Sequence, residues 1–448
     1  MAPSAVLSPV KGQFEAPSNT LNSKATKLNG FSSSATHKTI PIDAPLNANH
    51  KWWWDRCAPL LNSMLDSSEG YTNEEKADHL RVFRDVVCPS FGLPTPQARV
   101  RPLLTYDGST FEPSWNFTKG DDGVIRYTFE PLGDSAGSPE DPFAGDIGRS
   151  MMPILSRVSS GVDMRWYEQI LDAWFVSPAE AEAARANMPP FITRVPQLFL
   201  AYDMKRAQRT LKAYFFPVLK HFAHNMPTSD LVFDTIRNLR PCGEALAKPA
   251  AKLQAYLAGC REPCLVEMMA IDCVDPRRAR VKIYARTLSN SRAVLADALT
   301  LGGAQADEVA LAGVETADGV WHLLLDEPEG MMAAAQRKNA RDMRNLHKGI
   351  CFAFELRQGE DRVDVKAHLP WGQTSRSDAQ TVDNFTRALR NVGWDASADK
   401  FARGAADTAR LQGQDYSKAG GLSYVSYNYG TKGCYMSSYF SPLVQENL

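Results

Sequence analysis

The chain has 448 residues, 44% of them hydrophobic and 23% charged, which is the composition of an ordinary soluble globular protein. The length suggests two or three average domains or one large barrel, and the formal net charge of −1 argues against a general nucleic-acid binder. No apolar run approaches membrane-spanning length and no apolar segment marks a secretory signal, so we expect no membrane association.

The cysteines are scattered and form no C-x-x-C pair. Cys260 and Cys264 lie four residues apart, but no second Cys or His pair lies nearby to complete a zinc site. Scattered thiols of this kind are typical of an intracellular protein, and we expect a cytoplasmic protein with reduced cysteines.

Residues 1–48 are rich in Ser, Ala, Pro, Asn, Thr and Lys and poor in aromatics, which predicts a disordered tail. A transit peptide is the alternative, although the arginines expected of one are missing. We expect residues 49–448 to form a single domain, which starts abruptly at the run Trp52-Trp53-Trp54.

Helical and extended patterns alternate along this domain, bounded by Gly, Pro and N-cap residues. In chain order the expected elements are helices 51–66 and 73–87, strands 100–106 with 111–116 and then 124–129, helices 163–174 and 178–188, strands 199–203 and 210–215, helices 229–238 and 249–258, strands 266–272 and 280–286, helices 292–299 and 304–312, strands 321–325, 349–357 and 361–369, helices 378–391 and 397–411, and strands 422–429 and 434–440.

The segment 280–286 alternates strictly between polar and apolar residues, as a strand with two unlike faces does. Its polar face carries Arg280, Lys282, Tyr284 and Arg286, with no acidic residue among them. Cations and a hydroxyl at every second position form a row of donors that suits phosphate oxygens. A solvated outer face is the alternative that this strand alone leaves open.

Similar polar faces recur along the chain. Their markers are Arg126, Lys212 with Tyr214, Lys282 with Tyr284, Lys366 with His368, and Tyr435 with Tyr439. Successive markers lie about 69 to 86 residues apart, which indicates a repeat.

Each interval holds helical sequence and two strand candidates. Ten antiparallel strands close most naturally into a barrel, because closure removes the edges. We therefore predict an α+β protein: a ten-stranded antiparallel β-barrel surrounded by helices, built from five αββα repeats. The cations would then face the lumen, where they lack acidic partners because they jointly await an anion.

At this point the chain resembles the fungal dimethylallyltryptophan-synthase-type aromatic prenyltransferases, over about residues 50–445. The matching motifs are Phe111-Glu112-Pro113-Ser114-Trp115-Asn116, Arg126, Lys212-Ala213-Tyr214, Arg280-Val281-Lys282-Ile283-Tyr284, and Phe354-Glu355-Leu356-Arg357 ahead of Lys366. The resemblance implies the same barrel fold and the transfer of a dimethylallyl or longer prenyl group from its diphosphate to an electron-rich aromatic ring, in secondary metabolism.

The resemblance also implies roles for individual residues. Glu112 matches the carboxylate that hydrogen-bonds the acceptor, typically an indole N–H, and helps to remove its proton. The residues that would bind the diphosphate are Arg126, Lys212, Arg280, Lys282 and, from the repeat, Lys366. The residues that would shield the allyl cation are Tyr214, Tyr284, His368, Tyr435 and Tyr439. Arg286 is left out of the site because it lies further along its strand.

Metal binding is not expected. The sequence has no D-D-x-x-D motif, Asp121-Asp122 is expected in a polar turn, and His221 and His224 lack an evident third ligand. We expect no required cofactor, with Mg²⁺ or Ca²⁺ at most helping product release.

Position 368 departs from the family, which commonly has Tyr there. A neutral His offers a smaller aromatic face, whereas a protonated one would oppose the allyl cation. The departure bears on prenyl chain length, and an exposed, inert His368 is the alternative.

Other functions stay open at this point. They are a non-catalytic barrel that binds a small molecule, a cyclase, and a transferase with a phenolic, polyketide or tyrosine acceptor. The partners expected are a prenyl diphosphate and an aromatic small molecule, with no nucleic acid and no membrane, in a monomer or homodimer.

Overall fold

The computed structural model describes residues 45–94, 97–120, 123–328, 337–343 and 345–444. Nearly all of the expected tail and the Asp121-Asp122 turn therefore lie outside the described residues. Within the described part, no helix is both long and apolar enough to cross a bilayer.

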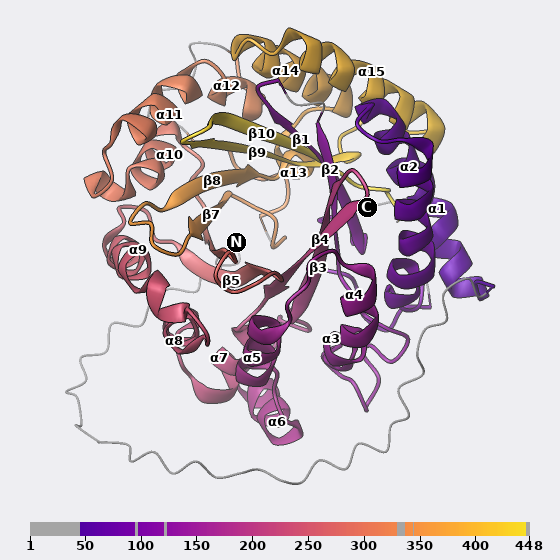
Figure 1. Ribbon diagram of the computed structural model, residues 1–448, viewed down its shortest axis with the longest axis vertical. Coiled ribbons are helices and arrows are strands. Elements are labelled where there is room, and N and C mark those ends of the chain that lie inside the picture. Colours follow the sequence, from indigo (N-terminus) through magenta and orange to yellow (C-terminus); the bar gives the residue numbers. More distant parts are fainter. Residues whose placement is uncertain (1–44, 95–96, 121–122, 329–336, 344, 445–448) are drawn as a thin grey trace, which may run out of the picture. The chain divides into compact units, whose positions relative to one another are not determined.

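Ten antiparallel strands form a closed barrel, as predicted, in the order β1-β10-β9-β8-β7-β6-β5-β4-β3-β2 (Figure 1). The strands are β1 Phe111–Thr118, β2 Val124–Phe129, β3 Leu198–Lys205, β4 Gln208–Phe215, β5 Leu265–Asp272, β6 Val281–Thr287, β7 Ile350–Leu356, β8 Asp364–Leu369, β9 Leu422–Gly430 and β10 Gly433–Phe440. Each strand pairs with its sequence neighbours, and β1 with β10 closes the circle.

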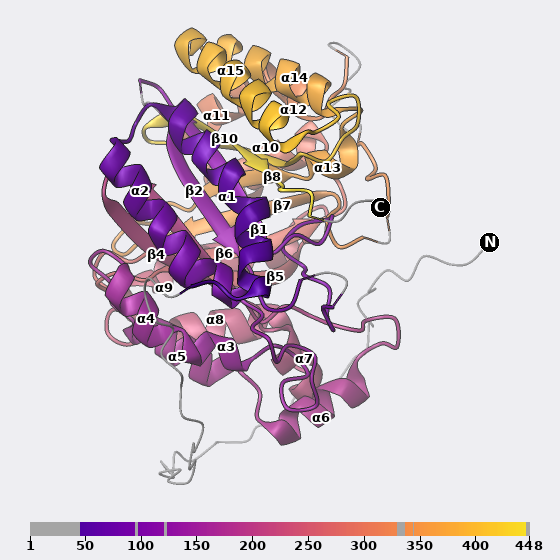
Figure 2. The same cartoon turned by 90° about the vertical axis from the view of Figure 1, so that its right-hand side faces the viewer.

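Helices enclose the barrel, and Figures 1 and 2 show them on its outer side in two views at right angles. They are α1 Ala48–Ser68, α2 Asn73–Val82, α3 Asp146–Ser150, α4 Met152–Val158, α5 Arg165–Trp174, α6 Pro178–Asn187, α7 Val218–His224, α8 Thr228–Asn238, α9 Ala247–Gly259, α10 Arg292–Leu299, α11 Glu308–Asp318, α12 Trp321–Leu324, α13 Trp371–Thr374, α14 Asp378–Asn391 and α15 Asp395–Gln412, with short π and 3₁₀ turns at Phe83–Val87, Cys88–Ser90, Gly243–Leu246 and Leu301–Gly303.

The outward faces of the strands are apolar and bind the helices. Trp115 and Phe117 of β1 pack against Phe401 of α15, with ring centroids 6.2 and 5.9 Å away. The helix can approach this closely because position 404 is glycine: a Cβ there would lie 2.6 Å from the Trp115 ring. First and last helices also meet, where Ser63 of α1 bonds Thr408 at 3.0 Å. This packing leaves the inward faces to line the lumen.

Two predicted strands are wrong. The segment 100–106 has no strand structure: Pro102 has no N–H to give a ladder, and the N–H groups of Leu103 and Leu104 donate to the Glu130 carboxylate. The segment 321–325 is instead helix α12, because its mainly apolar sequence fits either structure and the Trp321 indole donates to the Asn290 carbonyl.

One predicted helix is displaced along the chain. The expected helix at 304–312 starts later, as α11, where the Asp307 side chain accepts from the Ala310 N–H and caps it.

Candidate active site

The strand register brings the polar faces of the strands together inside the barrel. Arg126 on β2 lies opposite Asp203 on β3, and Lys212 on β4 lies opposite Asp272 on β5. Side chains of strands that are not neighbours also meet, since Arg126 donates to the Tyr435 hydroxyl on β10. Because β1 lies between β2 and β10, side chains of these two strands can meet only by crossing one face of β1. We take this face, on the concave side of the closed sheet, to be the lumen side.

Cations and carboxylates alternate around part of the lumen wall. The Lys212 ammonium lies 2.6 Å from Asp203 and 3.7 Å from Asp272. The Arg280 guanidinium lies 2.6 Å from Asp272 and 3.2 Å from Glu355. The series, which we call the charged network, is Arg126, Asp203, Lys212, Asp272, Arg280, Glu355 and Lys282.

These pairs correct the expectation that the cations lack acidic partners. The carboxylates come from β3, β5 and β7, the barrel neighbours of the strands that carry the cations. Cross-strand register places them, so the pattern of a single strand does not reveal them. Cations still exceed carboxylates at this end, because Lys366 joins the network's four cations against its three acids. The surplus suits a bound anion.

Two lysines at this end are driven toward neutrality. Burial, with Lys212 and Arg280 nearby, lowers the pKa of Lys282 to about 8. Burial, followed by the charges of Arg126 and Lys282, also puts the pKa of Lys366 well below its ordinary value. A multivalent anion would counter both effects, because opposite charge favours the protonated form.

Lys366 is held by hydroxyl groups. Its ammonium donates to Ser437 at 3.1 Å and to Tyr439 at 3.3 Å, and lies 4.5 Å from the centroid of the Tyr435 ring. Among the described residues, no carboxylate forms an ion pair with it. Lys366 is therefore the cation of the site that is most open to an incoming anion, and the face of Tyr435 is already covered by it.

Asn116 is a hub that the sequence did not single out. Its Oδ1 accepts from the hydroxyls of Tyr435 at 2.6 Å and Ser437 at 2.7 Å, and from Arg126 at 3.3 Å. Asn116 shares the inward face of β1 with Glu112 and Ser114, so the alternation of that strand was a usable signal.

An aromatic belt separates the charged network from the rest of the lumen. Tyr214 and Tyr284 have ring centroids 5.8 Å apart, and His368 lies 5.9 Å from both Tyr284 and Tyr439. Tyr424 extends the belt at 6.5 Å from Tyr439. Tyr424 was not among the expected site residues, although it faces Tyr439 across the β9–β10 register.

His368 belongs to this belt as a neutral ring. Burial, together with the nearby Lys366 charge, holds its pKa well below the ordinary value. Its Nδ1 lies 3.2 Å from the Cys351 carbonyl, which can only accept, so Nδ1 carries the proton. His368 is thus partly buried in the belt and not exposed, and a neutral imidazole does not oppose an allyl cation.

Glu112 lies beyond the belt, where it is 7% exposed. Burial raises the pKa of Glu112 to about 8, against the hydrogen bond that its Oε1 accepts from Ser423 at 2.7 Å. Within the described residues no cation pairs with it. A buried carboxyl with a pKa near neutrality is suited to accept a proton, rather than to sit as an ordinary strand-end carboxylate.

The rest of this end is uncharged or internally compensated. Arg286 pairs with Glu267 at 2.7 Å and donates to the Lys348 carbonyl at 3.0 Å. Glu267 lies at a bulge in the β5–β6 register, which turns its side chain toward Arg286. His347 bonds the Tyr424 hydroxyl at 2.6 Å, and burial lowers the pKa of His347 to about 3.

No group of three or more His, Cys, Asp or Glu side chains is placed to hold a metal ion, as far as the described residues go. His221 bonds the Met226 carbonyl and His224 bonds Glu180, at 2.8 and 2.7 Å.

Known proteins match the chain over most of its length. A family model described as tryptophan dimethylallyltransferase matches residues 49–403. The indole diterpene prenyltransferase terF of Tolypocladium album is 32% identical, covering 91% of this chain and 98% of the relative. The O-glucose prenyltransferase PaPT of Phomopsis amygdali is 29% identical, with 92% and 93% covered. The crystal structure of NotF in complex with brevianamide F and DMSPP has a TM-score of 0.78 at 21% identity, with 92% of this chain and 100% of that one covered.

The family match extends over more than half of the chain, and the solved structure shares the closed barrel. Together they confirm the resemblance that the sequence motifs indicated. The chain therefore belongs to the tryptophan dimethylallyltransferase family and is an aromatic prenyltransferase.

Proposed function

We propose that the protein transfers a dimethylallyl group from dimethylallyl diphosphate to an uncharged indole. The observation that carries this proposal is the order of groups along the lumen: surplus cations, then aromatic rings, then a buried carboxyl. The diphosphate would bind to Arg126, Lys212, Arg280, Lys282 and Lys366, and the indole would lie beside Glu112. A longer prenyl chain is the alternative donor.

The donor end would stabilise both products of ionisation. When the bond between the allylic carbon and the diphosphate oxygen breaks, pyrophosphate takes the electron pair and the cations stabilise its charge. The allyl cation left behind would lie against the faces of Tyr214, Tyr284, His368 and Tyr439, whose quadrupoles favour positive charge. The closed barrel keeps water away from that cation.

The acceptor end would supply the base. Glu112 accepts a hydrogen bond from the indole N–H, which raises the electron density of the ring. The ring then forms a C–C bond to the allylic carbon, and the excess proton passes to Glu112 as aromaticity is restored. Ser423, which donates to the same carboxylate, holds it in position.

The acceptor end also favours an indole without a free carboxylate. Among the described residues, the charged side chains on inward strand positions here are Glu112 and the paired Arg286 and Glu267. A free amino acid would place its carboxylate near Glu112 and find Arg286 already neutralised. Burying an unpaired charge is costly, so a neutral indole fits better.

The names of the relatives agree with an indole acceptor, but they also call for a wider panel of acceptors. The relative terF is named an indole diterpene prenyltransferase, and PaPT is named an O-glucose prenyltransferase. An acceptor panel therefore needs a large neutral indole, tryptophan, tyrosine and a glucoside. Family membership supports transfer rather than passive binding or cyclisation.

We also propose that transfer needs no metal ion, because side-chain cations supply the charge that Mg²⁺ supplies in other prenyl transfer. Mg²⁺ or Ca²⁺ would only speed product release. Activity in EDTA with dimethylallyl diphosphate tests this, and complete loss that Mg²⁺ restores would contradict it. A cytoplasmic location, in agreement with eight free thiols, and a monomeric or dimeric state are further predictions.

The acceptor class is tested by freeing Arg286. In the wild-type protein, kcat/KM for a neutral indole should exceed that for tryptophan. Glu267→Gln leaves the guanidinium unpaired, so it should raise the tryptophan-to-indole ratio of kcat/KM by about tenfold, the size of one charge-assisted hydrogen bond.

Glu262→Gln, the same change just before β5, is the matched control and should leave the ratio unchanged. A wild-type preference for tryptophan would show that its carboxylate is recognised elsewhere.

A further inference from the structure

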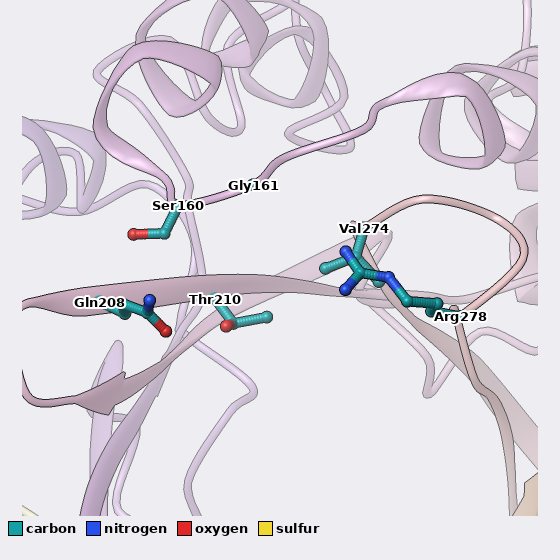
Figure 3. Close-up of a pocket in the computed structure, with 6 residues that line it drawn as sticks. All are labelled: Ser160, Gly161, Gln208, Thr210, Val274 and Arg278. Atoms are coloured by element: carbon teal, nitrogen blue, oxygen red, sulfur yellow. The ribbon is translucent and has the colours of Figure 1, made fainter.

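A pocket of about 390 Å³ lies at the rim of the barrel, next to the charged network. Its lining comes from three separate segments: the turn before α5, the start of β4 and the loop between β5 and β6. The lining residues are Ser160, Gly161, Gln208, Thr210, Val274 and Arg278 (Figure 3).

The strand register connects this pocket to the charged network. Thr210 precedes Lys212 by two residues, so both face the lumen, and Thr210 lies opposite Asp203. Val274 follows Asp272, the last residue of β5, through a tight turn in which the Val274 N–H donates to the Asp272 carbonyl at 2.9 Å. Two residues along a strand span about 7 Å, so the pocket begins one step beyond the pair of Lys212 and Asp272.

The pocket exists because the strands part at this point. The last rung between β4 and the chain after β5 joins the Cys273 N–H to the Leu211 carbonyl at 2.9 Å. Beyond it, the segment that contains Ser160 is inserted: its N–H donates to the Arg209 carbonyl at 2.8 Å, and Val162 bridges Val274. The inserted segment holds the two strand ends apart and roofs the pocket.

The lining suits an anion. Its polar side chains are two hydroxyls, one amide and the Arg278 guanidinium, and it contains no carboxylate. Among the described residues Arg278 has no side-chain partner, whereas the neighbouring Arg277 is bound by the Asp275 carboxylate at 3.1 and 3.2 Å through its Nε. Figure 3 shows the Arg278 side chain extending from its loop toward Val274 and the strand of Thr210.

We propose that this rim pocket is an outer anion site, through which pyrophosphate leaves the barrel after the prenyl group has been transferred. The inference rests on the proposed function, because it assumes that pyrophosphate is formed in the charged network. Glu112 and the acceptor occupy the opposite end, so the leaving group has a separate route at its own end.

The carboxylates of the network would assist this departure. Asp203 pairs with Lys212, and Asp272 pairs with Arg280. As pyrophosphate moves outward, these carboxylates can pair again with the cations that it leaves, while Arg278 binds the anion. The step forms and breaks ion pairs only.

The first test measures the affinity of inorganic pyrophosphate for the full-length protein by calorimetry in EDTA. Arg278→Gln should weaken binding about two- to fivefold, the size of one partly exposed ion pair. Arg277→Gln is the matched control and should not change the Kd, because its guanidinium is held by Asp275. Equal Kd values for wild type and Arg278→Gln would overturn the proposal.

The second test blocks the route. Gln208→Trp, at an exposed position, should fill the pocket and slow both binding and release of pyrophosphate in a stopped-flow chase. Lys205→Trp, on the same β3–β4 hairpin but outside the lining, should leave both rates unchanged. Unchanged rates in Gln208→Trp would show that pyrophosphate leaves by the acceptor end.

The two tests separate this inference from the proposed function. If no acceptor is prenylated but pyrophosphate affinity depends on Arg278, the proposed function fails and the anion site stands. If the wild type prenylates an indole while both pocket variants behave as wild type, the enzyme stands and the outer site is wrong.

Discussion

The two ends of the lumen handle charge in opposite ways. At the donor end, Lys212 and Arg280 alternate with carboxylates from neighbouring strands, and positive charge remains in surplus. At the acceptor end, Arg286 is the one cation among the described inward strand positions, and Glu267 neutralises it. Glu112 has no cationic partner among the described residues. The aromatic belt lies between them.

Burial favours the neutral form of the ionisable group at both ends. It lowers the pKa of Lys282 to about 8 and raises that of Glu112 to about 8, so both groups titrate near neutral pH. Each substrate would then supply what its end lacks: negative charge for the lysines, and a donor N–H for the carboxyl. Each end of the lumen therefore lacks the charge or the donor that its proposed substrate carries.

The largest effect is expected from removing the base. Glu112→Gln keeps the shape but cannot take up a proton, so kcat with an indole should fall about 10²- to 10⁴-fold, with little change in donor affinity. In the wild type, kcat/KM for the acceptor should rise with pH up to about 8, because the carboxylate is the active form.

A pH–rate profile of both proteins checks this, and the rising limb should vanish in the variant. A limb that persists in Glu112→Gln would assign the titration to another group.

A smaller effect is expected at the donor end. Lys282→Gln should weaken dimethylallyl diphosphate binding about tenfold to hundredfold, because a charged hydrogen bond is lost. Since the cation exists below its pKa, wild-type donor affinity should fall as the pH rises past about 8. Calorimetric titration across pH measures both.

Lys248→Gln, an exposed position paired with Asp361, serves as the control. Equal affinities for Lys282→Gln and wild type would remove Lys282 from the donor site.

The smallest effect is expected in the belt between the two ends. His368 is neutral, so His368→Tyr alters volume and not charge, and kcat with dimethylallyl diphosphate should change by less than about threefold. The bulkier ring should nevertheless lower the relative use of geranyl diphosphate. Competition between the two donors measures this, and a collapse of kcat would mean that the imidazole moves a proton.

Much of the barrel was predictable because its strands carry strong local signals. The seven residues 280–286 alternate clearly between a polar and an apolar face. The recurrence of that pattern predicted ten strands and a closed barrel. The misses have a common cause. A short, mainly apolar segment such as 321–325 carries no clear period. The loop at 100–106 is decided by Pro102 and by contacts with Glu130 that a local pattern does not contain.

The site was predictable only in part. Residue types suited to bind a diphosphate could be read along each strand, and the structure brings them together in one lumen. The carboxylates that pair with these cations could not be predicted. Only the register with a neighbouring strand places Asp203, Asp272 and Glu355 beside a cation. Asn116 is intermediate: its alternation with Glu112 was visible, but its three donors come from β2 and β10.

The pairing of β1 with β10 has a consequence for how the enzyme is made. Trp115 pairs with Ser438, so the barrel cannot close during synthesis until β10 has left the ribosome. Until then β1 and β9 keep open edges, which are templates for aggregation. A message that stops before β10 should thus yield insoluble chains, with no weakened enzyme among them. Only complete chains would reach the active pool.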